Sequence, residues 1–220
     1  YDGSSWTEVA DLNTARRGTG SAGTQTAALA IAGNQGPPGS AEEVEQWDGS
    51  SWTEVGDVNT TRQYGASIGP SSTSAIFASG MTAPGNTFRT HVEQWNGTSW
   101  TEIADVNTAR RNVAGFGTVT AGLIAAGGEP DASAKVELWD GSSWTETGDV
   151  TTGRDAVTGA GAVQTYGLIF GGEPATGKTE VWDGTSWREE ADLGTATRNC
   201  AGTGTGSLAL GAGGYDPGDP

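Results

Sequence analysis

The stretch WDGSSW at residues 47–52 decides the fold of this 220-residue chain, because close copies of it recur along the whole sequence. The fifth copy, at the start of the chain, carries Tyr1 in place of the first Trp. A period of roughly 43–48 residues without a helical pattern is typical of the four-stranded blades of a β-propeller. The second Trp of the copies falls at positions 6, 52, 100, 144 and 187.

Each repeat predicts four short strands. The first follows an Arg and is built from small residues, as in residues 113–116, and the second is the most apolar, as in residues 123–126. A Gly pair, or a degraded pair such as Ser79-Gly80, ends the second strand. The third strand alternates between apolar and polar residues, as in residues 92–95, which is the period of a half-buried strand.

The turn between the third and fourth strands is a hairpin signal. Asp-Gly or Asn-Gly lies between the two Trp residues of each copy, and such dipeptides favour tight turns. A two- or four-residue loop would place Trp47 directly opposite Trp52. A type I turn with a bulge would shift that pairing, and the sequence leaves both arrangements open.

Counting strands predicts how the ring closes. The chain has five copies of the first, second and fourth strands but four complete copies of the third. Tyr1 matches the end of a third strand, and the last second strand ends near Gly214. We therefore expect one blade to combine strands from both termini, which would remove exposed sheet edges. The expected fold is a single all-β domain over residues 1–220, a five-bladed propeller with repeats at roughly 1–46, 47–94, 95–138, 139–181 and 182–220.

The order of these features resembles the kelch repeat. Arg, a small-residue strand, an apolar strand, Gly-Gly, a variable loop, an aromatic-Asp turn and Trp follow one another over nearly the whole chain. Trp stands where kelch repeats usually carry Tyr, and two of the five Gly pairs are degraded. The near-identical copies also resemble kelch-like repeats encoded by bacteriophages and environmental viral genomes. This second resemblance implies an extracellular or virion location.

Composition indicates that Trp forms much of the core. Val, Ile, Leu and Phe make up about 14% of the chain and the net charge is −16, a combination typical of disordered chains. Nine Trp residues contradict disorder, because each can bury a large apolar area. Their recurrence in every repeat predicts packing between blades rather than stacking on sugars. The Trp residues expected in this structural role are Trp6, Trp52, Trp100, Trp144 and Trp187.

Charge and hydropathy argue against nucleic acid and membrane as partners. With 27 acidic residues against 11 basic ones, the average field repels nucleic acid and anionic lipid. The longest apolar run, residues 27–32, is far shorter than the roughly 20 residues that span a bilayer. We expect neither nucleic-acid binding nor membrane insertion.

The sequence lacks the ligands that a metal or redox site of this kind would need. The kelch resemblance raises the copper oxidase of that family, which needs His and Tyr ligands and a Tyr-Cys cofactor. Here there is one His, His91, and one Cys, Cys200, with four scattered Tyr residues. His91 is expected on the surface, and Cys200 is expected to pack as a small apolar residue in an inner strand. We expect no metal and no cofactor.

Hydrolysis of glycosides remains a remote alternative. Such enzymes need two carboxylates at a defined separation. The inner strands supply Asp155, and Glu129 and Glu173 follow their Gly pairs on the same expected face. The near uniformity of the repeats argues against an active site, since a catalytic site needs unmatched residues with different pKa values. We therefore expect no enzymatic activity.

A series of Arg residues opens the inner strands. Each is preceded by an Asp five or six residues earlier, so an Arg–Asp clamp at each blade-to-blade turn is expected, and a positive ring that holds an anion is the alternative. The Arg residues are Arg16, Arg62, Arg110, Arg154 and Arg198, and the Asp residues are Asp11, Asp57, Asp105, Asp149 and Asp192.

The loops after the Gly pairs differ in length and charge while the strands barely change. A constant scaffold with variable loops on one face is how binding modules are built. We expect a non-catalytic recognition propeller, with a glycan or protein ligand on this face; the alternative is a structural or decorating protein that engages other virion proteins. A carboxylate-bearing glycan is favoured because guanidinium groups bind carboxylates in a bidentate manner. The expected ligand-binding residues are Arg17, Arg111, Arg89, Glu129 and Glu173.

Overall fold

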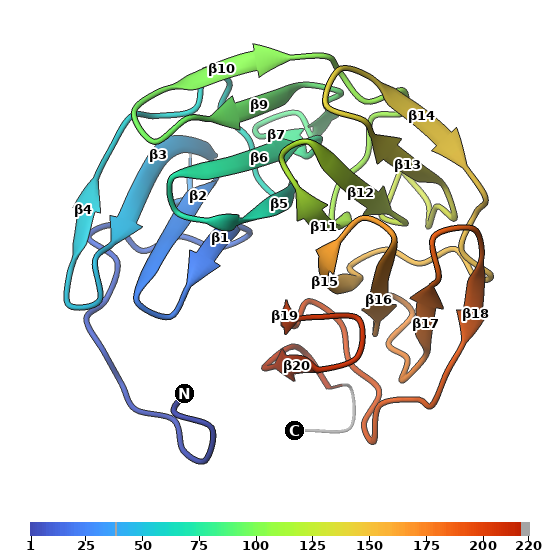
Figure 1. Cartoon of the computed structure of the whole chain (residues 1–220). Coiled ribbons are helices and arrows are strands. Elements are labelled where there is room, and N and C mark those ends of the chain that lie inside the picture. The colour runs from blue at the N-terminus through green and yellow to red at the C-terminus, as the bar shows by residue number, and fades with distance from the viewer. Residues whose placement is uncertain (38, 217–220) are drawn as a thin grey trace.

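The computed structural model describes residues 1–37 and 39–216, and every regular element in them is a β-strand. Four antiparallel four-stranded sheets, or blades, follow one another around a central channel (Figure 1). The loop predicted at residues 34–42 and the fifth repeat both include residues outside the described part of the chain. In the described residues, no helix has the length and hydropathy needed to cross a membrane.

Within each blade the innermost strand lines the channel and the fourth strand lies at the rim (Figure 1). The first blade consists of β1 (Gly20–Thr24), β2 (Ala27–Asn34), β3 (Ser40–Trp47) and β4 (Trp52–Glu54). The second consists of β5 (Ala66–Ser71), β6 (Ser74–Ala78), β9 (Val92–Trp95) and β10 (Trp100–Ile103). The third consists of β11 (Ala114–Thr118), β12 (Ala121–Ala125), β13 (Val136–Trp139) and β14 (Trp144–Thr147). The fourth consists of β15 (Thr158–Val163), β16 (Tyr166–Phe170), β17 (Thr179–Trp182) and β18 (Trp187–Glu189).

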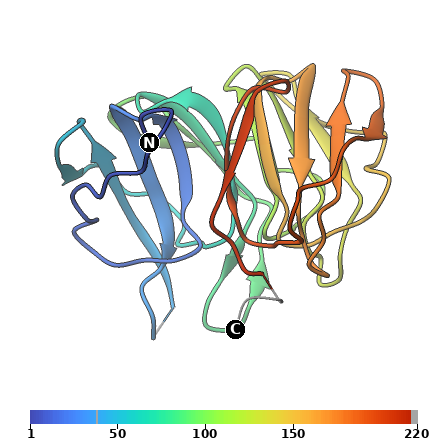
Figure 2. The ribbon, with the colours of Figure 1, turned by 90° about the horizontal axis from the view of Figure 1, so that it is seen from below.

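Two small sheets complete the strand list. The short hairpin β7 (Met81–Thr82) and β8 (Thr87–Phe88) lies in the loop after the second Gly pair and projects from one face of the ring (Figure 2). The fifth repeat forms only β19 (Ala201–Gly204) and β20 (Ala209–Ala212), which pair with each other. All four residues of β19 are exposed.

The structure therefore corrects the expectation of five complete blades to four blades and a two-stranded sheet. Residues 1–19 contain no strand, and the ring stays open between them and β20 (Figure 1). Successive blades are tied at the channel by backbone bonds such as Asn112 N to Tyr64 O (2.7 Å). Among the described residues no backbone hydrogen bond joins β19 or β20 to residues 1–19, so closure by the two termini is not confirmed. Within the part of the chain that the structure describes, no strand lies between β20 and residues 6–9 to carry hydrogen bonds from one to the other.

The hairpin turns take the four-residue form. Trp47 pairs directly with Trp52, and their ring centroids lie 5.4 Å apart. The same register holds in each complete blade. In the turn, the Asp48 carboxylate accepts bonds from the backbone N–H groups of Ser50 and Ser51, both at 2.8 Å. These bonds explain why Asp or Asn begins the turn in every copy.

The second residue of the Gly pair must be Gly. Gly127 has φ +97°, and a Cβ placed on it would lie 2.6 Å from the carbonyl oxygen of Arg111, whose backbone pairs with Gly128. The preceding position tolerates a side chain even in the left-handed region, since Ala126 has φ +59°. The pair read as Gly127-Gly128 is therefore aligned one residue too late. Ala126-Gly127 is the structural counterpart of the pairs in the other repeats, such as Ser79-Gly80.

The hydrophobic core lies between neighbouring blades. One cluster joins Phe116 and Leu123 of the third blade to Ile169 and Trp182 of the fourth, and two similar clusters join the first, second and third blades. Trp144 is 6% exposed, in line with the structural role expected for it. Trp52 is half-buried, and Trp6, beside the two-stranded fifth sheet, is exposed at 66%.

Candidate functional site

One structural position at the mouth of the channel varies from blade to blade. It lies just before the inner strand, and its backbone pairs with the residue that follows or lies close to the Gly pair of the same repeat. The next residue in the chain takes a left-handed φ, as Tyr64 (+60°) and Asn112 (+51°) do. The side chains at this position, in chain order, are Arg17, Gln63, Arg111, Asp155 and Arg198.

This alignment corrects the assignment of Arg198. Asp192 lies six residues before Arg198 rather than five, and the structural counterpart of Arg16, Arg62, Arg110 and Arg154 is Thr197. The carbonyl oxygen of Thr197 accepts the N–H of Gly172, as the carbonyl oxygen of Arg154 accepts the N–H of Gly127. Arg198 instead pairs in the backbone with Tyr215 and belongs to the variable position.

The constant Arg residues form clamps, but with Glu rather than Asp. Arg110 Nη2 lies 2.8 Å from Glu137 Oε1 in the third strand of the same blade, and both side chains are fully buried. The other Glu137 oxygen accepts the backbone N–H of Asn107 at 2.6 Å, so the carboxylate also fixes the turn before the Arg. Burial lowers the pKa of Arg62, Arg110 and Arg154, and the Glu partners counter that shift. The four pairs are Arg16–Glu45, Arg62–Glu93, Arg110–Glu137 and Arg154–Glu180.

The expected Asp partners are therefore wrong. Asp11, Asp57, Asp149 and Asp192 lie in exposed or half-exposed turns, and Asp105 accepts a bond from the Thr90 hydroxyl at 2.7 Å instead. The sheet pairing, rather than the local sequence, brings each Glu to its Arg across about thirty residues of chain. A Glu recurs two residues before the first Trp in all four complete third strands, and this recurrence is the signal of the clamp in the sequence.

Next to the clamps, the variable side chains meet in a pocket of about 270 Å³. Arg111 Nη2 lies 3.4 Å from Asp155 Oδ2, and Asn112 Nδ2 donates to Asp155 Oδ1 at 3.0 Å. Arg111 also lies over the ring of Phe88 in the β7–β8 hairpin. The lining residues are Tyr64, Arg111, Asn112, Asp155, Ala156, Glu173, Arg198 and Asn199.

A second ion pair lies on the other side of this pocket. Arg198 Nη1 pairs with Glu173 Oε2, and the Arg198 guanidinium lies 4.6 Å from the centre of the Tyr215 ring. Both partners are about one third to one half exposed, so the pair is accessible from solvent. The pocket thus offers two cations, two anions and two Asn side chains around a Tyr.

The five residues expected to bind a ligand are placed differently. Arg111 and Glu173 meet in the pocket, and Arg17 lines the adjoining channel. Within the described residues the Arg17 guanidinium has no hydrogen bond or ion pair. Arg89 instead donates to the Thr82 hydroxyl at 3.2 Å, and Glu129 pairs with Lys135 at 3.3 Å, so both serve their own loops. The sequence did not indicate Tyr64, Asn112 or Asn199.

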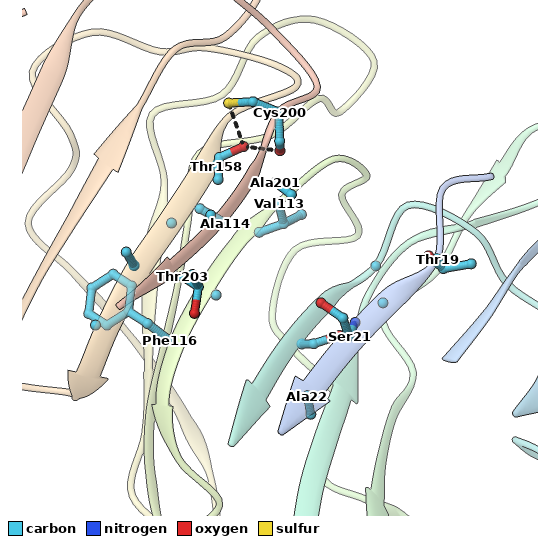
Figure 3. Close-up of a pocket in the computed structure, with 18 of the residues that line it drawn as sticks. Thr19, Ser21, Ala22, Val113, Ala114, Phe116, Thr158, Cys200, Ala201 and Thr203 are labelled. Carbon is cyan, nitrogen blue, oxygen red and sulfur yellow. Dashed lines mark hydrogen bonds between the residues drawn. The ribbon is translucent and has the colours of Figure 1, made fainter. Parts of the chain in front are cut away.

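The channel itself has walls of small residues and a volume of about 990 Å³. Figure 3 shows this wall, with Ala114 and Thr158 on one side and Thr19 and Ser21 on the other. Cys200 is half-buried rather than buried, and its thiol donates to the Thr158 hydroxyl at 3.2 Å (Figure 3). His91 is half-buried at the start of β9, not on the open surface. In residues 1–37 and 39–216, no three His, Cys, Asp or Glu side chains form a group that could hold a metal ion.

The fold and this channel define a β-propeller. A solved structure titled "Structure of YjhT" is similar to this chain with a TM-score of 0.80 and 11% sequence identity, over 97% of this chain and 82% of that one. No family model and no curated protein matches the sequence. At this identity the similarity shows the fold alone.

Proposed function

We propose that this protein is a non-catalytic binding module whose ligand site is the channel mouth around Tyr64, Arg111 and Asp155. The observation that carries the proposal is the contrast between two neighbouring positions. The clamp position keeps Arg in all four complete blades. The next position carries Arg, Gln or Asp, and its members Arg111, Asp155 and Arg198 line the pocket. A rigid scaffold that varies only where it meets solvent favours recognition.

The chemistry of the pocket favours a glycan that carries a carboxylate. Asn112, Asp155 and Asn199 offer the donors and acceptors that sugar hydroxyls need, and the Tyr64 ring offers an apolar face. Arg111 and Arg198 already face acidic partners, whereas Arg17 lies in the adjoining channel wall without one. Arg17 is therefore the group available to a ligand carboxylate.

Catalysis is a weaker alternative on the same geometry. Asp155 and Glu173 both line the pocket, but each carboxylate lies against an Arg. Because both carboxylates of the pocket are already engaged in ion pairs, we favour a binding role. On the resemblance to phage-encoded repeats, we propose a virion surface or another extracellular setting, with contact to other virion proteins as the second candidate function.

The test is binding of the purified chain to an array of acidic and neutral oligosaccharides. We expect retention on carboxylate-bearing glycans, loss of retention in the Arg17→Ala, Arg111→Ala double variant, and no change in Arg188→Ala. Arg188 is a matched control because it pairs with Glu190 on the outer strand, away from the channel. Binding that survives the double variant would place the site elsewhere. Failure to retain any glycan, together with co-assembly with virion proteins, would favour the second candidate function.

A further inference from the structure

Five residues form a neck between the pocket and the channel. Each directly follows the variable position of its repeat, and each has a left-handed backbone, with φ between +51° and +62°. Four of these neck residues line the pocket and the channel alike, and the fifth, Gly18, lines the channel. In chain order the neck residues are Gly18, Tyr64, Asn112, Ala156 and Asn199.

Tyr64 is the neck residue least suited to this backbone. Gly adopts a positive φ without steric cost, and Asn does so more readily than other residues. A bulky side chain at φ +60° is strained, because its Cβ approaches the following carbonyl group. Strain of this kind is typical of functional sites, where the surrounding structure holds it in place.

Two neighbouring repeats hold the Tyr64 backbone in this conformation. Its N–H donates to the carbonyl oxygen of Gly18, just before the first blade, at 2.8 Å. Its carbonyl oxygen accepts the N–H of Asn112, just before the third blade, at 2.7 Å. Tyr64 therefore cannot relax to a negative φ without breaking a link between blades.

The neck also makes room for the Tyr64 ring. A Cβ placed on Gly18 would lie 2.5 Å from Cε1 of that ring, so any larger residue at this position would clash with it. The ring is half-buried, and within the described residues it belongs to none of the clusters that pack between blades. Packing of the blades thus does not account for a strained aromatic residue at this place.

The Tyr64 ring is also free of a cation. The Arg111 guanidinium lies 5.8 Å from the centre of the Phe88 ring, and the Arg198 guanidinium lies over the ring of Tyr215. In the part of the chain that the structure describes, no guanidinium lies over Tyr64, which is the one aromatic residue in the pocket lining. One aromatic surface of the pocket is therefore open to a ligand.

We propose that Tyr64 is the specificity-determining residue of this pocket and that it selects carboxylate-bearing ligands in the form of a closed sugar ring. This inference rests on the binding function proposed above and adds which acids the site accepts. The apolar C–H face of a pyranose packs on the Tyr64 ring. Its hydroxyls then reach the polar side chains of Asn112, Asp155 and Asn199 around the same pocket.

An open-chain acid lacks this fit for two reasons. Its carbon chain presents no rigid apolar face, so it buries less surface against Tyr64. It also loses more conformational freedom on binding, because its rotatable bonds must be fixed, whereas the bonds of a ring are fixed beforehand. The closed ring should therefore bind more tightly than a chain of similar composition.

The experiment compares two acids that differ mainly in ring closure. One is the methyl glycoside of glucuronic acid, whose pyranose ring cannot open, and the other is gluconate, an open-chain acid with a carbon skeleton of the same length. Titration of the whole chain at neutral pH, followed by NMR or calorimetry, gives both dissociation constants. We expect the wild type to bind the glucuronide at least about tenfold more tightly than gluconate.

Three variants separate a role in binding from a role in packing. Tyr64→Asn carries the residue found at this place in two other repeats, and it should lose the preference for the ring while its affinity for gluconate stays unchanged. Tyr64→Phe keeps an aromatic ring and should keep the preference. Tyr166→Asn is the matched control, because Tyr166 also lies against a Gly, Gly206, yet lines neither cavity. Its preference should equal that of the wild type.

A role in packing would give a different pattern. Tyr64→Asn would then lower the melting temperature and weaken the binding of both acids alike, and that result would overturn the proposal. Equal affinities of the wild type for the two acids would also overturn it, while the proposed binding function would stand. Binding of neither acid at millimolar concentration would overturn it as well, and the glycan array then decides whether the binding function fails with it.

Discussion

Arg110 and Glu137 are joined by an ion pair of 2.8 Å in which neither side chain is exposed to solvent. The same Arg donates to the carbonyl oxygens of Ala126 and Lys135, at 2.9 and 2.6 Å. One guanidinium thus ties the start of the inner strand to the second and third strands of its blade. The free energy needed to remove this guanidinium from water is offset only while each of its ion-pair and hydrogen-bond partners is present.

Removing one partner of this clamp should therefore be severely destabilising. We expect Arg110→Ala and Glu137→Ala each to lower the free energy of unfolding by about 3–5 kcal/mol, measured by urea denaturation, because either change leaves a buried group unpaired. The double variant Arg110→Met, Glu137→Leu should stay near wild-type stability, since no charge is then left in the core. Thr197→Val is the matched control in the blade without a clamp. An Arg110→Ala protein as stable as the control would show that the clamp contributes little.

The repeat pattern was sufficient for the strands and the hairpins, because their signals are local. Period-two alternation in residues 92–95 and the turn after Trp47 depend on neighbours in the chain. The partner of Arg110 could not be read in the same way, since Glu137 reaches it only through the register of the sheet. The prediction that Arg198 takes the clamp position was wrong. Arg198 is the nearest Arg in the repeat, but the five-residue spacing from Asp to the clamp position in the other repeats leads from Asp192 to Thr197.

Counting the predicted strands was also not enough to give the number of complete blades. The sequence indicates that residues 1–9 match the end of a blade, and Tyr1 does take that position. The hydrogen bonds of a sheet, however, join only neighbouring strands, so β20 cannot pair with residues 6–9 without a strand between them. In the pocket, Tyr64 and Asn112 gave no pattern because the position they share differs between repeats, with Gly18, Tyr64, Asn112, Ala156 and Asn199 in chain order.

Gly127 provides a second prediction. We expect Gly127→Ala to lower the free energy of unfolding by roughly 1–3 kcal/mol, because Ala disfavours φ +97° and its Cβ would meet the Arg111 carbonyl oxygen. Gly148→Ala is the matched control, since a Cβ there meets nothing within 4 Å. Its stability should change by less than about 0.5 kcal/mol. Equal effects of the two changes in chemical denaturation would contradict the role assigned to the second Gly of the pair.

The turn carboxylates predict a specific response to acid. Hydrogen bonds from Ser142 and Ser143 lower the pKa of Asp140 to about 2, below the ordinary value near 3.9. The stabilisation from this turn is therefore fully present above about pH 4 and is lost as the pH falls toward 2. Carbon NMR of the carboxyl groups should report the lowered pKa.

Asp140→Asn supplies the control for that measurement. Asn96 occupies the same place in the second blade, and its Oδ1 accepts the N–H groups of Thr98 and Ser99, both at 2.9 Å. The variant should keep the turn and lose the part of the acid response that belongs to Asp140. A carboxyl that titrates near pH 4 in the folded protein would mean that these hydrogen bonds do not hold in solution.

The two Trp residues Trp144 and Trp6 occupy equivalent places in their repeats, yet they are 6% and 66% exposed. Trp144→Ala removes a buried ring from the interface of two blades and should lower the free energy of unfolding by about 3–5 kcal/mol. Trp6→Ala removes a ring packed mainly against Tyr1 and should change it by less than about 1 kcal/mol. Thermal or urea denaturation of both variants gives the comparison. An equally large loss in Trp6→Ala would require Trp6 to be buried in solution, and the fifth repeat would then be a closed blade rather than an open edge.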